Sequence, residues 1–196
     1  NTDDALDMVK TNTIVIVCDV HVPSMTMEPK LLDNASKIVV IDHHRRAEEF
    51  IENPVFNLID PSASSACELV CEFIKFSSIT PKITIPPLFA TIMLSGIFMD
   101  SRSFESKSTG IRTFEMAAFL KENGADASMA TDYLKDDFEE YQIVTDLVGN
   151  KEYPPYANGV ICTFGDEETI YDGDTLSKVC NKLLSFKGMH AAFAVA

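Results

Sequence analysis

The chain has 196 residues, which is enough for one large domain or for one domain and part of a second. Hydrophobic residues make up 46% of it, so a buried core can form and a disordered chain is excluded. The formal net charge of -14 repels the phosphate backbone of long nucleic acids, which disfavours them as partners. The charge does not exclude a small phosphate ligand, because bound divalent metal ions can reverse the local field.

Cysteine usage and hydropathy indicate the compartment. The cysteines are odd in number and widely spaced, which argues against a disulfide framework and favours a reducing cytoplasm. No apolar run approaches the ~20 residues that span a bilayer, and no signal peptide opens the chain. We therefore expect a cytoplasmic segment without membrane contact. The five cysteines are Cys18, Cys67, Cys71, Cys162 and Cys180.

Two short β-branched runs, residues 14–18 and 37–41, predict the first two strands. Continuous apolar runs of this length are typical of strands buried on both faces of a parallel sheet. Residues 31–35 between them predict a short crossover helix. Asp19 follows the first strand and Asp42 the second. In open parallel sheets ligands bind beyond the carboxyl ends of the strands, so these polar residues are expected to share one rim.

The rest of the chain predicts mostly helices, and then a second α/β pattern after a Pro-rich stretch. Residues 88–99 are apolar nearly all round, which indicates a buried helix. The predicted fold class is therefore α/β: a three-layer domain with a mostly parallel sheet over residues 1–149, a linker at 150–158, and the start of a second, smaller α/β domain at 159–196. The further expected elements are a strand at 55–59, helices at 64–76, 88–99, 109–124, 126–134 and 137–148, a strand at 159–164, a helix at 175–186 and a strand at 189–196.

The run Asp42-His43-His44-Arg45-Arg46 carries the clearest chemical signal. Carboxylate and imidazole together suit manganese, iron or zinc. Adjacent strand residues point to opposite sides, so one histidine can ligate a metal while its neighbour contacts a phosphate, and Asp42 can orient an imidazole. A polar strand end with two solvated histidines is the other reading.

Three further features bear on that choice. Asp19 and Asp100 each end an apolar segment, where a carboxylate serves either a site rim or a cap. The serines of residues 62–65 precede a helix, so their amides can bind an anion or their hydroxyls can cap the helix. Both uses stay open from the sequence.

Five segments together resemble the DHH phosphoesterases, most of all the membrane-anchored cyclic di-AMP phosphodiesterases of Gram-positive bacteria. The resemblance covers nearly the whole chain, in order. It implies metal-activated hydrolysis of a phosphodiester, with a cyclic dinucleotide as partner, and an intact protein anchored to the membrane; it leaves a homodimer open. The segments are Asp19–Ser24, Asp42–Ile51, Asp60–Val70, Gly96–Phe104 and Thr109–Phe114.

The resemblance also implies roles by position. Asp19, His43 and Asp100 match metal ligands of a two-manganese centre. His44 matches a residue that contacts the scissile phosphate, and Asp42 matches its supporting carboxylate, so these two are the expected catalytic pair. The expected substrate-binding residues are His44, Arg45, Ser64 and Ser65. The implied reaction is hydrolysis of cyclic di-AMP to the linear dinucleotide by a water that two Mn2+ ions activate.

The departures from the family pattern lead to a further expectation. The family's upstream His-x-x-x-Asp-x-Asp motif and its glycine-rich segment ending in Gly-Gly-His have no match here. We therefore expect an internal fragment that is inactive by itself and holds at most one metal ion weakly. Two alternatives to the cyclic di-AMP enzyme remain: a RecJ-type exonuclease or oligoribonuclease of the same superfamily, and a non-catalytic interaction fragment.

Overall fold

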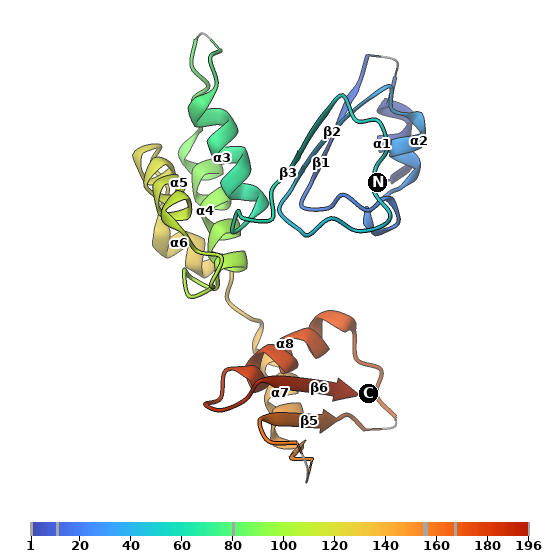
Figure 1. Ribbon diagram of the computed structural model, residues 1–196, viewed down its shortest axis with the longest axis vertical. Coiled ribbons are helices and arrows are strands. Elements are labelled where there is room, and N and C mark those ends of the chain that lie inside the picture. The colour runs from blue at the N-terminus through green and yellow to red at the C-terminus, as the bar shows by residue number, and fades with distance from the viewer. Residues whose placement is uncertain (1, 11, 80, 155–156, 167, 196) are drawn as a thin grey trace. The chain divides into compact units, whose positions relative to one another are not determined.

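The computed structural model describes residues 2–10, 12–79, 81–154, 157–166 and 168–195. The chain divides into two compact units, residues 1–134 and 135–196 (Figure 1). The sequence placed this division later, at a linker over residues 150–158. The difference arises because the helix at 138–149 packs against a helix of the second unit rather than closing the first.

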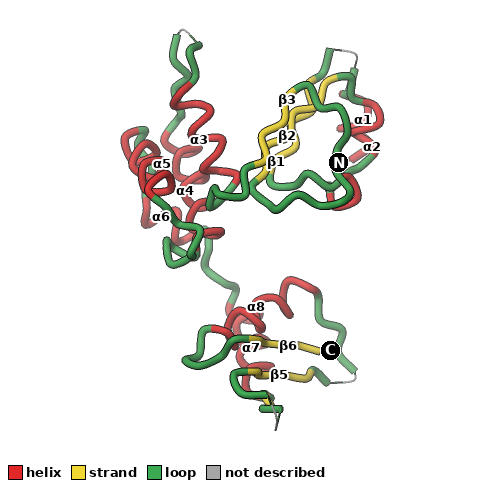
Figure 2. The backbone as a smooth tube through the Cα atoms, in the orientation of Figure 1, coloured by secondary structure: helices red, strands yellow, loops and turns green. Residues whose placement is uncertain are grey.

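A parallel sheet of three strands forms the amino-terminal half of the first unit. The strands β1 (Ile14–Cys18), β2 (Lys37–Asp42) and β3 (Phe56–Ile59) lie in the order β1-β2-β3 (Figure 2). Cys18 pairs in register with Ile41 across the first two strands. The α/β fold with a parallel sheet is therefore confirmed, and the carboxyl ends of the strands meet at one edge.

Helices cover both faces of this sheet. Val40 faces one side and packs with Leu32 of α2. Ile41, the next residue along β2, faces the other side and packs with Leu69 of α3. Three layers result, in the order helix, sheet, helix. The helical segments of the first unit are α1 (Thr2–Met8), the 3-10 turn η1 (Pro23–Met25), α2 (Lys30–Asn34), α3 (Ala66–Phe76), α4 (Pro87–Ser101), α5 (Ile111–Glu122) and α6 (Ala127–Asp132).

Helices α3 to α6 enclose the largest core of the first unit, around Leu94, Ile97 and Met116. The expectation that residues 88–99 are buried all round is wrong, because the neighbouring helices cover only part of the surface of α4. Phe89 stays 58% exposed and Met99 64% exposed. Apolar composition alone therefore did not predict how much of the surface of α4 other helices cover.

Glycine 96 allows α4 to approach α3 closely. A Cβ atom at this position would lie 2.5 Å from Sγ of Cys67, which is too short for any real contact. The close approach matters for the site described below, because α4 continues from Gly96 to Asp100 within one turn.

The second unit has its own sheet and core. Strand β5 pairs in parallel with β6 and antiparallel with β4. Leu147, Ile161, Val179 and Leu183 form the core between this sheet and two helices. The elements are α7 (Phe138–Gly149), β4 (Lys151–Glu152), β5 (Val160–Phe164), α8 (Gly173–Leu184) and β6 (Ala191–Val195). Across the described parts of both units, every helix is too short or too polar to cross a membrane.

Candidate active site

The carboxyl ends of β1 and β2 carry the polar residues that the sequence singled out. Asp19 directly follows β1 and has a φ of 67°, in the left-handed region that aspartate tolerates better than most residues. Its amide still donates to the carbonyl oxygen of Ile41 at 2.9 Å. The chain therefore turns away from the sheet at Asp19, directly after β1, and the carboxylate of Asp19 lies at the rim of the sheet.

Asp19, His43 and Asp100 come together at this rim. Nε2 of His43 lies 3.3 Å from Oδ1 of Asp19 and 3.8 Å from Oδ2 of Asp100. Ligand atoms of Asp19, His43 and His44 all lie within 4.8 Å of one another. The residues belong to three segments far apart in the sequence: the end of β1, the loop after β2 and the last turn of α4. The strand ends predicted one rim for Asp19 and His43, and Asp100 joins them there from the end of an apolar helix.

The electrostatics of this cluster suit a cation. Burial raises the pKa of Asp100, and the nearby charge of Asp19 raises it further. Two carboxylates so close together repel each other unless a positive charge lies between them. Two carboxylate oxygens with an imidazole nitrogen are a donor set that manganese, iron and zinc accept, so the residues fit the metal that the family resemblance implies.

Asp42 organises the neighbouring histidine. It is fully buried, and its Oδ1 accepts both the backbone N–H of His44 at 3.1 Å and Nδ1 of the same residue at 2.8 Å. Burial raises the pKa of Asp42, but hydrogen bonds from His21 and His44 outweigh it and hold the pKa below its ordinary value. Asp42 therefore stays a carboxylate and leaves Nε2 of His44 as the nitrogen available to a ligand.

His44 itself is 57% exposed at the cluster. Burial lowers its pKa, while the hydrogen bond to Asp42 and the charge of that carboxylate raise it more, so the pKa ends above the ordinary histidine value. With Nδ1 held by Asp42, the ring presents Nε2 at the same rim as the candidate metal ligands. Asp42, by contrast, is fully buried at the edge of this rim and is hydrogen-bonded to His44.

The sequence argument missed His21, which is only 3% exposed. Its Nδ1 lies 2.5 Å from Oδ2 of Asp42, and its Nε2 accepts the backbone N–H of Ala47 at 3.0 Å. One signal was available: His21 stands two residues after Asp19, beyond the same strand end. Nothing in the residue type distinguishes such a histidine from a solvated one.

A cavity of about 340 Å³ opens beside the cluster, between the segment after β1 and the segment after β2. Asp19, His44 and Arg45 line the cavity, and Val22 and Met25 form an apolar part of its wall; substrate binding by Arg45 stays a prediction. Its volume lies within the usual range of ligand sites.

Ser64 and Ser65 serve the start of α3. Oγ of Ser64 donates to Oε2 of Glu68 at 2.6 Å, and Oγ of Ser65 accepts the backbone N–H of Glu68 at 3.0 Å. Both serines are almost fully buried. Of the two uses that the sequence left open, the structure shows the capping one, and substrate binding by these serines stays a prediction.

The loop that precedes these serines is tied to α5 by Arg112, which the sequence argument did not single out. Nη1 of Arg112 donates to Oδ2 of Asp60 at 2.9 Å, and its Nε and Nη2 hold Glu72 at 2.8 and 2.7 Å. A hydrogen bond from Ser62 and then the one from Arg112 lower the pKa of Asp60. This network fixes the connection between β3 and α3.

Cys67 lines an apolar cavity of about 290 Å³ that also touches Asp19 and Asp100. Burial raises the pKa of the Cys67 thiol to about 11, and burial raises that of Cys71 to about 12. In the metal-free protein both thiols are therefore protonated at neutral pH and pack as small apolar groups.

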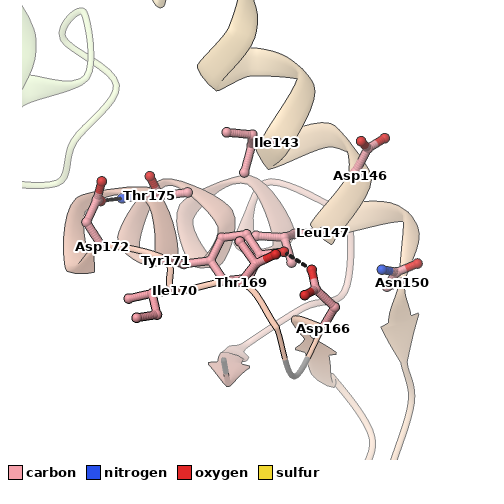
Figure 3. Close-up of a pocket in the computed structure, with 10 residues that line it drawn as sticks. All are labelled: Ile143, Asp146, Leu147, Asn150, Asp166, Thr169, Ile170, Tyr171, Asp172 and Thr175. Atoms are coloured by element: carbon pink, nitrogen blue, oxygen red, sulfur yellow. Dashed lines mark hydrogen bonds between the residues drawn. The ribbon is translucent and has the colours of Figure 1, made fainter.

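A larger cavity, of about 420 Å³, is lined only by residues of the second unit (Figure 3). Tyr171 donates to Oδ2 of Asp166 at 2.8 Å along its wall, and Asp172 caps α8 nearby. Size alone would select this cavity. It contains none of the residues that converge at the first sheet, so the chemistry selects the smaller one.

Comparison with known proteins identifies relatives of the chain. The family model described as "DHH family, N-terminal domain" matches residues 1–97. The chain is 36% identical over 194 residues to the cyclic-di-AMP phosphodiesterase GdpP of Geobacillus thermodenitrificans, covering 99% of this chain and 29% of that protein. It is 34% identical over 123 residues to the bifunctional oligoribonuclease and PAP phosphatase NrnA of Mycoplasma genitalium, covering 62% of this chain and 37% of that protein.

The fold also matches a solved structure, an exopolyphosphatase-related protein from Bacteroides fragilis. The TM-score is 0.80 at 17% identity, and the match covers 99% of this chain and 58% of that one. The chain thus spans less than a third of the length of the phosphodiesterase and more than half of the length of the structural neighbour. The family model and the sequence comparisons lead to one conclusion: this chain belongs to the DHH family, whose N-terminal domain matches residues 1–97.

Proposed function

We propose that the intact protein is a manganese-dependent phosphodiesterase that hydrolyses cyclic di-AMP to the linear dinucleotide. The observation that carries the proposal is the convergence of Asp19, His43 and Asp100 from three separate segments, beside a histidine that a buried carboxylate holds. Likeness over nearly the whole chain to a protein named as a cyclic-di-AMP phosphodiesterase supports the choice of substrate.

In this proposal each residue has a separate task. Asp19, His43 and Asp100 hold metal, and two bound Mn2+ ions supply a water of lowered pKa and offset charge on the phosphate. His44 contacts an oxygen of the scissile phosphate through Nε2, because Asp42 occupies its Nδ1. Asp42 keeps the proton of His44 on Nδ1 and fixes the direction of the ring.

In this proposal the substrate binds in the cavity of about 340 Å³ beside the cluster. One nucleoside of cyclic di-AMP lies against the apolar wall at Val22 and Met25, while its phosphate lies at His44. Arg45 at the same cavity pairs with the second phosphate. Anchoring of the intact protein to the membrane, which the family resemblance implies, belongs to the same proposal.

The test is turnover of cyclic di-AMP by the intact protein with Mn2+, with the product identified by mass. We expect the linear dinucleotide, and we expect Asp100→Asn to lower the rate by about 100-fold or more because it weakens the metal site. Glu105→Gln, which removes a charge at an exposed position a few residues away, should leave the rate unchanged. No turnover by the wild-type protein with Mn2+ would overturn the proposal.

A second candidate is an oligoribonuclease, which the likeness to NrnA over 123 residues favours. The net charge of -14 opposes long RNA but not fragments of a few nucleotides. Rates on a short linear RNA and on cyclic di-AMP, measured in the same buffer, decide between the two. If Asp100→Asn changes neither rate, the non-catalytic reading of this segment is the correct one.

A further inference from the structure

His21 uses both of its ring nitrogens in the interior of the protein. Nδ1 lies 2.5 Å from Oδ2 of Asp42, and Nε2 lies 3.0 Å from the backbone nitrogen of Ala47. A backbone N–H can only donate, so Nε2 of His21 must accept and carry no proton. The proton of the neutral ring is therefore on Nδ1, where it is donated to Asp42. The geometry alone assigns this tautomer.

Asp42 depends on that donor. Its carboxylate is fully buried, and Oδ1 already serves His44, so His21 provides the side-chain hydrogen bond to Oδ2. A buried carboxylate oxygen without a donor is costly. Without His21, the rearrangement of lowest free energy is rotation of the Asp42 carboxylate. This rotation breaks the hydrogen bond between Asp42 and His44 that orients the His44 ring.

The loop after β2 is held by the same residue. Nε2 of His21 fixes the amide of Ala47, and the carbonyl oxygen of His21 accepts the N–H of Ile51 at 2.8 Å. The loop begins with His43 and His44, directly after Asp42. His21 therefore holds this loop directly at Ala47 and Ile51, and through Asp42 it also holds the start of the loop.

We infer that His21 is a positioning residue for the proposed hydrolysis: it holds Asp42 and the loop after β2 so that Nε2 of His44 faces the substrate phosphate beside Asp19 and His43. The inference rests on the proposed function for its catalytic consequence. The contacts themselves are independent of any substrate. The side chain of His21 borders the cavity with only 3% of its surface exposed, so its effect on the cluster passes mainly through its hydrogen bonds to Asp42 and Ala47.

Two isosteric substitutions separate these two contacts. In His21→Asn the amide nitrogen takes the place of Nδ1, so the donor to Asp42 is kept and the acceptor for Ala47 is lost. In His21→Gln the amide oxygen takes the place of Nε2, so the acceptor is kept and the donor to Asp42 is lost. The pair thus changes one hydrogen bond at a time with similar side-chain volume.

In the intact protein, with Mn2+ and cyclic di-AMP, His21→Gln should lower kcat by about 10–100-fold, the usual effect of losing a supporting partner. KM should change much less, because His21 is only 3% exposed at the cavity and therefore offers the substrate little contact. His21→Asn should retain most of the wild-type kcat. A merely structural histidine would lower kcat equally in both variants, in step with their loss of thermal stability, and that result would overturn the inference.

A spectroscopic measurement makes the test independent of activity. Long-range correlations between ring protons and ring nitrogens report the tautomer of His44 in the 196-residue chain when the imidazoles are neutral. We expect the Nδ1–H form in the wild type and in His21→Asn, and a mixture of both tautomers in His21→Gln. An unchanged His44 tautomer in His21→Gln overturns the inference. Absence of wild-type turnover, in contrast, overturns the proposed function and leaves this measurement valid.

Discussion

At the scale of single residues, the carboxylates of Asp19 and Asp100 repel each other in the candidate metal site. Asp100 and Asp19 lie against the same imidazole, and burial together with the charge of Asp19 raises the pKa of Asp100. A carboxyl group whose pKa rises on folding destabilises the folded state when it is ionised. The arrangement is therefore useful to a bound cation and unfavourable to the chain without one.

Asp100→Asn should make the metal-free chain more stable. The variant removes the ionised carboxylate, so the free energy of unfolding at neutral pH should rise by about 0.5–1 kcal/mol, the size of a partly exposed charge interaction. The gain should shrink as the pH falls toward and below the ordinary value of 3.8, because the wild-type carboxyl is then protonated in both states. Urea unfolding with a chelator, at neutral and at acidic pH, measures both effects.

Glu105→Gln is the matched control, because it removes one negative charge from an exposed position outside the cluster. Added Mn2+ should reverse the order and stabilise the wild type more than Asp100→Asn, since a ligand that binds only the folded state raises its stability. An Asp100→Asn chain that is less stable than the wild type without metal would contradict this account.

The sequence predicted part of this site for a physical reason. Parallel strands end at one edge, so Asp19, Asp42 and His43 could be placed together from strand boundaries alone. Asp100 could be assigned through its place at the end of an apolar helix and through the family resemblance. His21 could not, because its role depends on the amide of Ala47, which only the fold brings to its ring.

At the scale of elements, the contact between α3 and α4 positions one of the candidate ligands. The apolar sequence of α4 predicted a helix correctly. It could not predict that only one part of its surface is covered, because coverage depends on which helices pack there. Nor could it predict that Gly96 meets Cys67, since the two residues are 29 positions apart and meet only through helix packing.

Gly96→Ala should destabilise the first unit by about 1–3 kcal/mol, the usual cost of overpacking a tight contact. The added Cβ would lie 2.5 Å from Sγ of Cys67, so α4 must move away from α3 and carry Asp100 with it. Thermal unfolding measures the loss. Gly149→Ala in α7 is the control, because a Cβ there meets nothing within 4 Å.

The same contact provides a double-mutant test. Cys67→Ala removes the sulfur atom that the new Cβ would overlap. Gly96→Ala should therefore lower the free energy of unfolding much less in the Cys67→Ala background than in the wild type. Purely additive effects of the two substitutions would show that the destabilisation has another origin, such as a change within α4 alone.

At the scale of the whole molecule, the chain consists of two units with separate cores. The sequence placed the division at the Pro- and Tyr-containing stretch after α7, because that stretch has the composition of a linker. The structure places it before α7, whose Leu147 is 3% exposed and packs with Ile161, Val179 and Leu183. The stretch with linker composition therefore starts inside the second unit, where it contains strand β4, and only the packing of α7 shows to which unit that helix belongs.

Leu147→Ala decides between the two boundaries. If α7 belongs to the second unit, the cavity left by the truncated side chain should destabilise that unit by about 2–5 kcal/mol. Hydrogen exchange followed by mass spectrometry should then show faster exchange in β5 and α8, with exchange in residues 2–134 unchanged. Leu94→Ala, at a residue 1% exposed in the core of α4, should give the opposite pattern with a cost of similar size. Faster exchange of α3 to α6 in Leu147→Ala would instead assign α7 to the first unit.

The same two variants also test the candidate metal site. Asp19, His43 and Asp100 all lie before residue 135, so Leu147→Ala should leave the affinity of the site for Mn2+ unchanged. Leu94→Ala should weaken this affinity, because it loosens the helix that carries Asp100.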